Sequence, residues 1–273
     1  MPFQITNVSD QGTANPIVAR LSVQTSQLVK FCPGGEELHK SVLELFHNHV
    51  QKQLLECDQI SQEITREVLE IDTRLGKEGI KTQAAGRVVK VPHVTRLNQR
   101  IEQFLYCAKS SLRDLARLFA LFFGKEFDSA RYDRIVAWAE EEFGDDSELV
   151  RILRQDHDLW IKKIVSMRNA VEHPGGYSGH LHIHNITLVP PSHPNYPILE
   201  TPSWHLNDEP KEPIVEYLQA TVNNILEFCE DMLVICITMS GLPEMIGFAE
   251  IPESKRDPAC PIRIRAVPKN IPI

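Results

Sequence analysis

Apolar residues recur at steps of three and four along most of the chain, which is the period of an amphipathic α-helix. The first such stretch begins at Glu36, carries apolar positions from Leu43 to Leu75 and stops at Gly76. A helix of that length is typical of a wall of an elongated bundle. The same period predicts five main helices, over residues 36–75, 93–123, 131–143, 148–171 and 214–240. We therefore predict a mainly α fold based on a bundle of about five helices.

The helical period is absent between residues 180 and 206, where the pattern favours β-strands. Apolar residues stand among polar ones up to residue 191, a proline-rich turn follows, and a second strand is expected to return over 198–206. The apolar positions of the first strand are Leu181, Ile183, Ile186 and Leu188. We predict a β-hairpin inserted before the last helix, with Trp204 anchoring it to the bundle.

The two ends of the chain also lack the helical period. Residues 1–35 are polar and are expected to form an extended segment with a strand near 17–23. The last part of the chain is rich in proline, and we expect two short strands there, the second with Arg263 and Arg265 facing outward. The predicted organisation is an N-terminal extended segment (1–35), a helical bundle (36–241) with its hairpin at about 180–206, and a C-terminal extension (242–273).

The helix predicted over 148–171 ends in a stretch whose polar residues indicate a functional site. Arg168 falls on its apolar face, although a guanidinium keeps its charge and is costly to bury without a partner. His173 follows five residues later, and Pro174 with Gly175-Gly176 predicts the end of the helix there. The apolar positions expected to share the buried face with Arg168 are Trp160, Ile161, Ile164, Val165 and Val171.

The run Arg168-Asn169-Ala170-Val171-Glu172-His173 resembles the signature of the HEPN family (higher eukaryotes and prokaryotes nucleotide-binding domains). That signature is an arginine, then a polar residue that is often Asn, then a histidine after four to six intervening residues, near the end of a long helix. The resemblance covers about residues 36–240 in architecture and six residues in motif. It implies a metal-independent endoribonuclease that needs no cofactor and acts as a homodimer.

The resemblance makes Arg168, Asn169 and His173 the expected catalytic residues. A neutral histidine can take the proton of an RNA 2′-hydroxyl or protonate the leaving 5′-oxygen, because its pKa lies near the working pH. Arg168 would hold the phosphate and stabilise the charge that develops on it, and Asn169 would orient His173 or donate to the phosphate. In the family, two copies of the motif meet across the dimer interface, which would explain an arginine on an apolar face.

Five further residues are expected to contact the substrate. Lys109, Arg113 and Arg117 are spaced by four and would line up as a phosphate-binding ridge beside the Arg168 site. The alternative for these three is a solvated helix face. Glu172 and Tyr177 flank the signature, and Glu172 has the alternative role of a structural partner for Arg168. Some family toxins carry a tyrosine two residues after the histidine, a position that is Gly175 here.

His180, His182 and His184 fall on one face of the predicted strand. Two histidines at this spacing can chelate zinc, but a third ligand must come from elsewhere. The neighbouring sequence offers no acid or cysteine at ligand spacing, Asp208 being the closest later candidate. We expect no metal site and interpret the three histidines as an exposed face of the hairpin.

Composition narrows the classes of function. The formal charge is −8, from 29 Lys and Arg against 37 Asp and Glu, which argues against bulk coating of nucleic acid but not against a small local phosphate site. The six cysteines form no C-x-x-C pair, so we expect free thiols in a reducing compartment. The N-terminus lacks the features of a signal peptide, and the most apolar run, 225–239, is short and interrupted by acids. We therefore expect a cytoplasmic protein without a membrane span.

Two functions follow from these features. The first is an RNA-cleaving protein of HEPN type in a prokaryotic toxin–antitoxin or defence setting, with an antitoxin or regulatory protein as a partner. The second is a non-catalytic HEPN-like module that binds a protein, a nucleotide or RNA through the same dimer groove. An open, basic cleft between two Arg168/His173 pairs would favour the first, and a cleft closed by Glu172 or the hairpin would favour the second.

Overall fold

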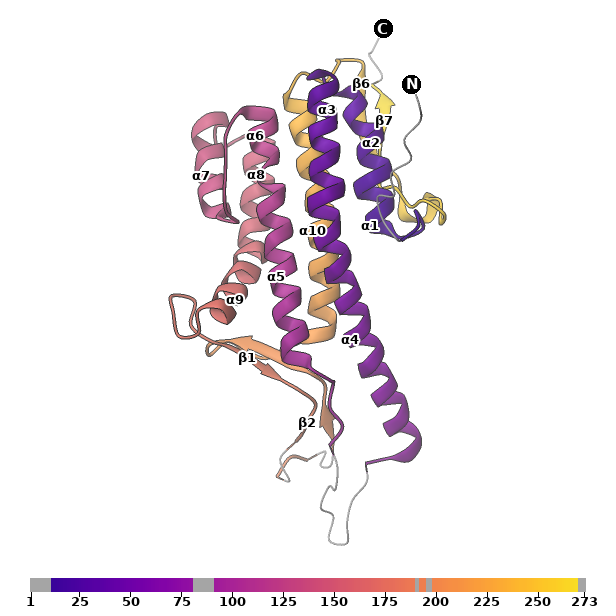
Figure 1. The fold of residues 1–273 in the computed structure, drawn as a ribbon, viewed down its shortest axis with the longest axis vertical. Coiled ribbons are helices and arrows are strands. Elements are labelled where there is room, and N and C mark those ends of the chain that lie inside the picture. The colour runs from indigo at the N-terminus through magenta and orange to yellow at the C-terminus, as the bar shows by residue number, and fades with distance from the viewer. Residues whose placement is uncertain (1–10, 81–90, 190–191, 195–197, 270–273) are drawn as a thin grey trace. The chain divides into compact units, whose positions relative to one another are not determined.

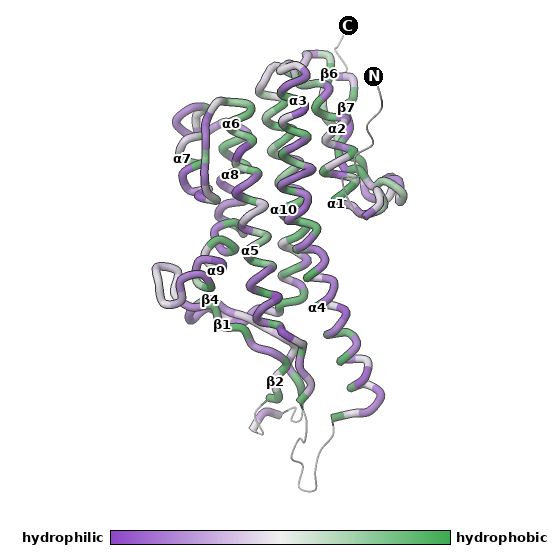
Figure 2. The backbone as a smooth tube through the Cα atoms, in the orientation of Figure 1, coloured by the Kyte–Doolittle hydropathy of each residue, from purple (hydrophilic) through white to green (hydrophobic). Residues whose placement is uncertain are grey.

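The computed structural model describes residues 11–80, 91–189, 192–194 and 198–269 (Figure 1). Over these ranges the chain is mainly helical, with small antiparallel sheets, as the hydrophobic period predicts. Hydrophobic and hydrophilic stretches alternate along the long helices α4 (Gln51–Glu78) and α5 (Leu97–Leu115) (Figure 2). None of the described helices combines the length and the apolar character needed to cross a membrane.

The chain divides into two compact units, and each is built from separate stretches of sequence. Unit one comprises Met1–Leu55, Ala108–Lys162 and Asn223–Ile273, and unit two comprises Glu56–Cys107 and Lys163–Val222. The predicted N-terminal segment and C-terminal extension therefore both belong to unit one. All of the boundaries between the units fall inside helical segments.

The N-terminal segment of unit one is helical, so the expected strand near 17–23 is wrong. The elements are α1 (Pro16–Val18), the π-helical η1 (Ala19–Gln24), α2 (Thr25–Leu28) and the short 3₁₀ turn η2 (Val29–Phe31). Asn15 caps the first turn, because its Oδ1 accepts the N–H of Ile17 at 2.8 Å, and Pro16 stands at the first helical position. The β-branched residues Ile17 and Val18 suggested a strand, but both are buried in the core of the unit, and burial overrides that local preference.

A buried ionic network ties this segment to the C-terminal part of unit one. Glu230, on helix α10 (Ile214–Met239), is 1% exposed. It accepts from Arg20 Nε at 2.9 Å, from Gln24 Nε2 at 2.7 Å and from Arg263 Nε at 2.8 Å. Arg263 also pairs with Asp231. The expectation that Arg263 faces outward is therefore wrong, because a buried carboxylate draws its guanidinium inward.

The two strands expected near the C-terminus are confirmed. They are β6 (Ile246–Glu250) and β7 (Ile264–Pro268), and they pair antiparallel with Gly247 opposite Val267. Arg265 is exposed on β7, as predicted. All six cysteines are free thiols, also as predicted, and five of them are buried.

The helix predicted over 36–75 is confirmed, with one departure from regular geometry. It comprises α3 (Gly35–Glu44), a π-helical segment η3 (Leu45–Val50) and α4. The helix predicted over 93–123 is instead broken by a turn at Ala116 and Arg117, which separates α5 from α6 (Leu118–Phe123). The next two predicted helices are present as α7 (Tyr132–Phe143) and as the run α8 (Glu148–Asp156), η4 (His157–Ile161) and α9 (Lys162–Glu172).

A buried tyrosine links α7 to α5 within unit one. Tyr132 is 1% exposed, and its hydroxyl donates to the carbonyl oxygen of Leu112 at 2.9 Å. Burial raises the pKa of Tyr132 well above its usual value. The same carbonyl also accepts the N–H of Ala116 at 3.1 Å, so it keeps a partner if the hydroxyl is removed.

We expect Tyr132→Phe to lower the free energy of unfolding by about 1 kcal/mol, the net value of one buried hydrogen bond. Urea unfolding followed by circular dichroism measures the change. Tyr177→Phe is the matched control, since Tyr177 is fully exposed and its hydroxyl should contribute little. Equal effects of the two substitutions would contradict the structural role of the Tyr132 hydroxyl.

Unit two carries the predicted hairpin. Strands β1 (Leu181–His184) and β4 (Ser203–Leu206) pair antiparallel with Ile183 opposite Trp204, and β5 (Glu212–Pro213) adds a third strand. A second short pair, β2 (Thr187–Leu188) with β3 (Leu199–Glu200), extends the hairpin. Trp204 is fully buried and packs edge-on against Tyr217 of α10 with ring centroids 5.0 Å apart. The hairpin and its tryptophan anchor are thus confirmed.

Candidate functional site

The helix end that carries the signature has a buried face different from the expected one. Trp160, Ile161 and Ile164 are buried as predicted, but the face then continues through Met167 and Ala170. Steps of three residues fall about 60° short of a full helical turn, so the buried face winds around the helix. The two remaining expected positions, Val165 and Val171, are consequently only half-buried. Arg168 lies beside the buried face, and its side chain is 16% exposed.

Arg168 is held between an aromatic ring and an acid, all within unit two. Its Cζ lies 5.6 Å from the centroid of the Tyr106 ring on α5, which is cation–π distance. Its Nη1 lies 4.0 Å from Glu172 Oε2, one helical turn away. That separation is longer than a hydrogen bond, so the acid does not occupy the donors of the guanidinium as a bidentate partner would. Asn169, the next residue, is half-buried.

Tyr106 is a site residue that the sequence analysis missed. It is 46% exposed, so it lies outside the apolar face of α5. An available signal was its place on the polar side of the helix, four residues after Glu102. An exposed aromatic among charged residues is a common partner for an arginine.

His173 leaves the helix where the sequence predicts. Helix α9 ends at Glu172, and the N–H of His173 donates to the carbonyl oxygen of Asn169 at 2.8 Å. The carbonyl oxygen of His173 accepts the N–H of Gly176 at 2.9 Å, which closes a turn around Pro174. The His173 side chain is exposed. The helix stop therefore places an exposed imidazole five residues beyond the half-buried guanidinium of Arg168.

The loop after His173 is tied down by its backbone and by Asn207. Gly175 and Gly179 both have positive φ, and the N–H of Gly175 donates to the carbonyl oxygen of Gly179 at 3.0 Å. Asn207 Oδ1 accepts the N–H of His180 at 2.9 Å, and Asn207 Nδ2 donates to the carbonyl oxygen of Ser178 at 3.2 Å. This arrangement leaves Tyr177 fully exposed in the loop.

Gly179→Ala should disrupt this loop. The φ of Gly179 is +76°, and an added Cβ would overlap Asn207 Oδ1. A strained residue of this kind costs about 1–3 kcal/mol, so we expect a lower melting temperature in a thermal unfolding experiment. Gly12→Ala is the control, because Gly12 has ordinary φ and no neighbour within 4 Å of the added atom. If Gly179→Ala melts at the same temperature as this control, the contacts of Asn207 with the loop do not hold it in place.

The basic residues of the expected ridge do not form a continuous helical stripe. Lys109 and Arg113 lie on α5, but Arg117 lies in the turn that follows it. Arg113 donates to Asp114 Oδ1 at 3.0 Å through Nη2, while Lys109 is half-buried. All three belong to unit one, whereas Arg168, Asn169, Glu172, His173 and Tyr177 belong to unit two. The signature and the expected ridge therefore belong to different compact units.

The three strand histidines share one face, as predicted, and the fold adds a fourth. His205 of β4 lies directly opposite His182 of β1. Within the described part of the chain, no group of three or more histidine, cysteine, aspartate or glutamate side chains is arranged to hold a metal ion. The four imidazoles form a row, in which the rings of His182 and His184 stack on His205 and the ring of His180 is tilted against His182.

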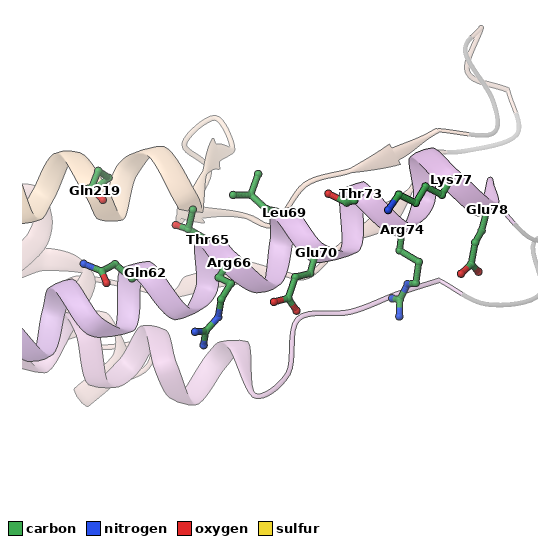
Figure 3. Close-up of a pocket in the computed structure, with 10 residues that line it drawn as sticks. All are labelled: Gln62, Thr65, Arg66, Leu69, Glu70, Thr73, Arg74, Lys77, Glu78 and Gln219. Carbon is green, nitrogen blue, oxygen red and sulfur yellow. The ribbon is translucent and has the colours of Figure 1, made fainter.

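A cavity of about 650 Å³ in unit two lies elsewhere (Figure 3). Its lining comes mainly from the C-terminal half of α4, with Gln219 of α10, and Leu69 there is 59% exposed. Figure 3 shows the charged side chains Arg66, Glu70 and Arg74 projecting from one edge of α4. None of the signature residues lines this cavity, so its size alone does not identify it as the site.

Comparisons of the chain with models of protein families, with curated proteins and with solved structures found no match. A proposal for its function therefore starts from the residues gathered at the end of α9.

Proposed function

We propose that this protein is a metal-independent endoribonuclease of HEPN type, in which Arg168, Asn169 and His173 act on RNA. The supporting observation is the burial of Arg168 and the position of its two neighbours. Its side chain is half-buried against the Tyr106 ring, and its acidic neighbour is 4.0 Å away. A guanidinium that is positioned by a ring, without a bidentate carboxylate, keeps donors for the oxygens of a phosphate.

The chemistry requires a base, an acid and a group that stabilises charge on the phosphate. A neutral imidazole takes the proton of the 2′-hydroxyl, and the 2′-oxygen forms a bond to phosphorus while the bond from phosphorus to the 5′-oxygen breaks. A protonated imidazole gives a proton to the leaving 5′-oxygen. The products are a 2′,3′-cyclic phosphate and a 5′-hydroxyl, and water is not consumed in this step. Arg168 stabilises the charge on the non-bridging oxygens.

One chain supplies one signature histidine, whereas the reaction uses one base and one acid. We propose that a homodimer places His173 of each subunit on opposite sides of the scissile phosphate. The exposure of His173 beyond the helix end leaves it accessible to a second subunit and to RNA. The cellular setting that goes with this activity is a cytoplasmic toxin or defence protein, controlled by an antitoxin or another regulatory protein.

The direct test is incubation of purified protein with total RNA and with tRNA, in buffer containing EDTA. We expect cleavage that persists in EDTA and leaves cyclic phosphate ends, which resist alkaline phosphatase and become its substrates after acid opening. Cleavage that EDTA abolishes would contradict a metal-independent reaction. Products with 5′-phosphate ends would contradict attack by the 2′-hydroxyl.

The contact between Arg168 and Glu172 supports a second candidate, a non-catalytic module that binds a protein, a nucleotide or RNA. If this pair is structural, Glu172 limits access of a phosphate to the guanidinium. This candidate predicts no cleavage of any RNA, together with binding that is lost in Arg168→Ala.

A further inference from the structure

Four imidazoles form a continuous row on one face of the β1–β4 sheet. The rings of His180 and His182 have centroids 6.3 Å apart, and the His182 and His205 rings stack at 4.6 Å with planes 18° apart. His184 stacks on the other side of His205 at 5.2 Å. His205 comes from β4, so pairing of two strands assembles the row. We call these four residues the histidine row.

The histidine row begins beside the loop that follows His173. Gly175 lies two residues after His173, and an added Cβ on Gly175 would be 3.3 Å from His180 Nε2. The His180 ring is therefore in contact distance of the helix stop that presents His173. From that point the row continues along β1 and β4, all within unit two.

The surroundings of His184 disfavour its charged form. Burial lowers the pKa of His184, and Lys211, His205 and His182 lower it further, against an opposite effect of Glu200. Two charged rings at stacking distance repel each other, so neighbouring rings resist charging together without an anion. His184 Nε2 is buried and makes no hydrogen bond within the described residues. His205 Nδ1, by contrast, is 2.5 Å from the carbonyl oxygen of Asn207.

We propose that the histidine row binds successive phosphates of a single RNA strand that extends from the Arg168/His173 site, and that the row takes up protons as the strand binds. The proposal rests on the proposed function for the identity of the strand. Cleavage by 2′-hydroxyl attack needs a flexible, unpaired linkage, which favours single-stranded RNA. In a chain of formal charge −8, protonated imidazoles provide a local positive surface without making the protein basic at neutral pH.

The proposal fixes the sign of the pH dependence. The phosphates of RNA favour the charged form of the imidazoles, so protons are taken up when the strand binds. Binding therefore strengthens as the pH falls through the range in which histidine titrates, near 6.5. Each proton taken up contributes up to about a tenfold change in affinity per pH unit.

The test measures binding of a fluorescent, single-stranded 2′-O-methyl oligoribonucleotide by anisotropy, between pH 6 and pH 8 at constant low salt. This probe lacks the attacking hydroxyl, so it reports binding without cleavage. For the wild type we expect a higher affinity at pH 6 than at pH 7, by at most about tenfold for one coupled proton. The affinity should also fall with salt concentration, as expected for phosphate contacts.

The variant His182→Gln/His205→Gln removes the two central rings. We expect its affinity at pH 6 to fall about tenfold, its pH dependence to flatten, and its salt slope to fall by about 1 for each lost phosphate contact. His182→Lys keeps a positive charge at both pH values, so it should bind at pH 7 at least as tightly as the wild type and with less pH dependence. His182→Gln alone, at an exposed position, repeats the test if the double variant melts early. His49→Gln, in unit one, is the matched control and should behave as the wild type.

The outcomes separate this proposal from the proposed function. Three results would overturn the histidine row as an RNA site. They are no RNA binding by the wild type at any pH, RNA binding that requires a divalent metal, and RNA binding that is unchanged in both His182→Gln variants. If the wild type cleaves RNA and any of these results is obtained, the proposed ribonuclease function still stands. Binding that depends on the row, without cleavage of unmodified RNA, would support the row and overturn the ribonuclease.

Discussion

Replacing Arg168 or His173 by alanine should lower the rate of RNA cleavage by about 100- to 10,000-fold, the range lost with a general acid–base group or a donor to a charged transition state. His173 is exposed and Arg168 is half-buried at the edge of α9, so both variants should remain folded. The measurement is the single-turnover cleavage rate on the RNA that the wild type cleaves, with circular dichroism spectra of each variant. Arg168→Lys should fall between the wild type and the alanine variant, since lysine keeps the charge but lacks the planar fork of donors.

Two controls match the residue types and leave the site untouched. Arg151→Ala removes an exposed arginine whose partner, Glu148, lies 3.5 Å away, and His49→Ala removes a histidine of unit one. Both should cleave at the wild-type rate. Cleavage that survives in Arg168→Ala and His173→Ala would place the activity at another site or in a contaminant.

Replacing Glu230 by alanine should lower the free energy of unfolding by about 3–5 kcal/mol, because it leaves buried guanidinium groups without their acid. Arg20 and Arg263 both donate to this carboxylate, and each is less than a tenth exposed. Gln24 would also lose its acceptor on Glu230. Urea unfolding at pH 7 measures the change.

Glu227→Ala is the control for this prediction, because Glu227 lies one helical turn earlier on α10 with an exposed side chain. Its effect should stay within about 0.5 kcal/mol, as for most surface substitutions. Glu230→Gln keeps the shape but not the charge and should fall between the two. A Glu230→Ala variant as stable as Glu227→Ala would mean that the arginines find water or other acids when the carboxylate is removed.

The sequence was a good guide wherever local physics decides the structure. The hydrophobic period located the helical segments between residues 36 and 240, and proline with two glycines located the end of α9 at Glu172. The change of period located the hairpin and the two strands near the C-terminus. These features depend on residues within a few positions of one another, so a single amino-acid sequence is enough to predict them.

The sequence was a poor guide where distant residues decide. Ile17 and Val18 have a local preference for strand, yet this segment is helical because its apolar residues are buried and Arg20 pairs with Glu230. Arg263 was likewise predicted to be exposed on a strand, because the sequence does not show which residue it pairs with. The partner that turns it inward lies 33 positions away, and periodicity carries no information at that range.

The same distinction between local and distant information applies to the candidate site. Sequence alone determined the chemistry offered at the end of α9, Arg168 and His173 beside a helix stop, because motif and stop are contiguous. Only the tertiary structure decided that Tyr106 lies under Arg168 and that His205 completes the histidine row. It also decided that Lys109, Arg113 and Arg117 belong to a different compact unit. Such contacts join helices and strands that are far apart along the chain, and packing of the whole core determines which of them meet.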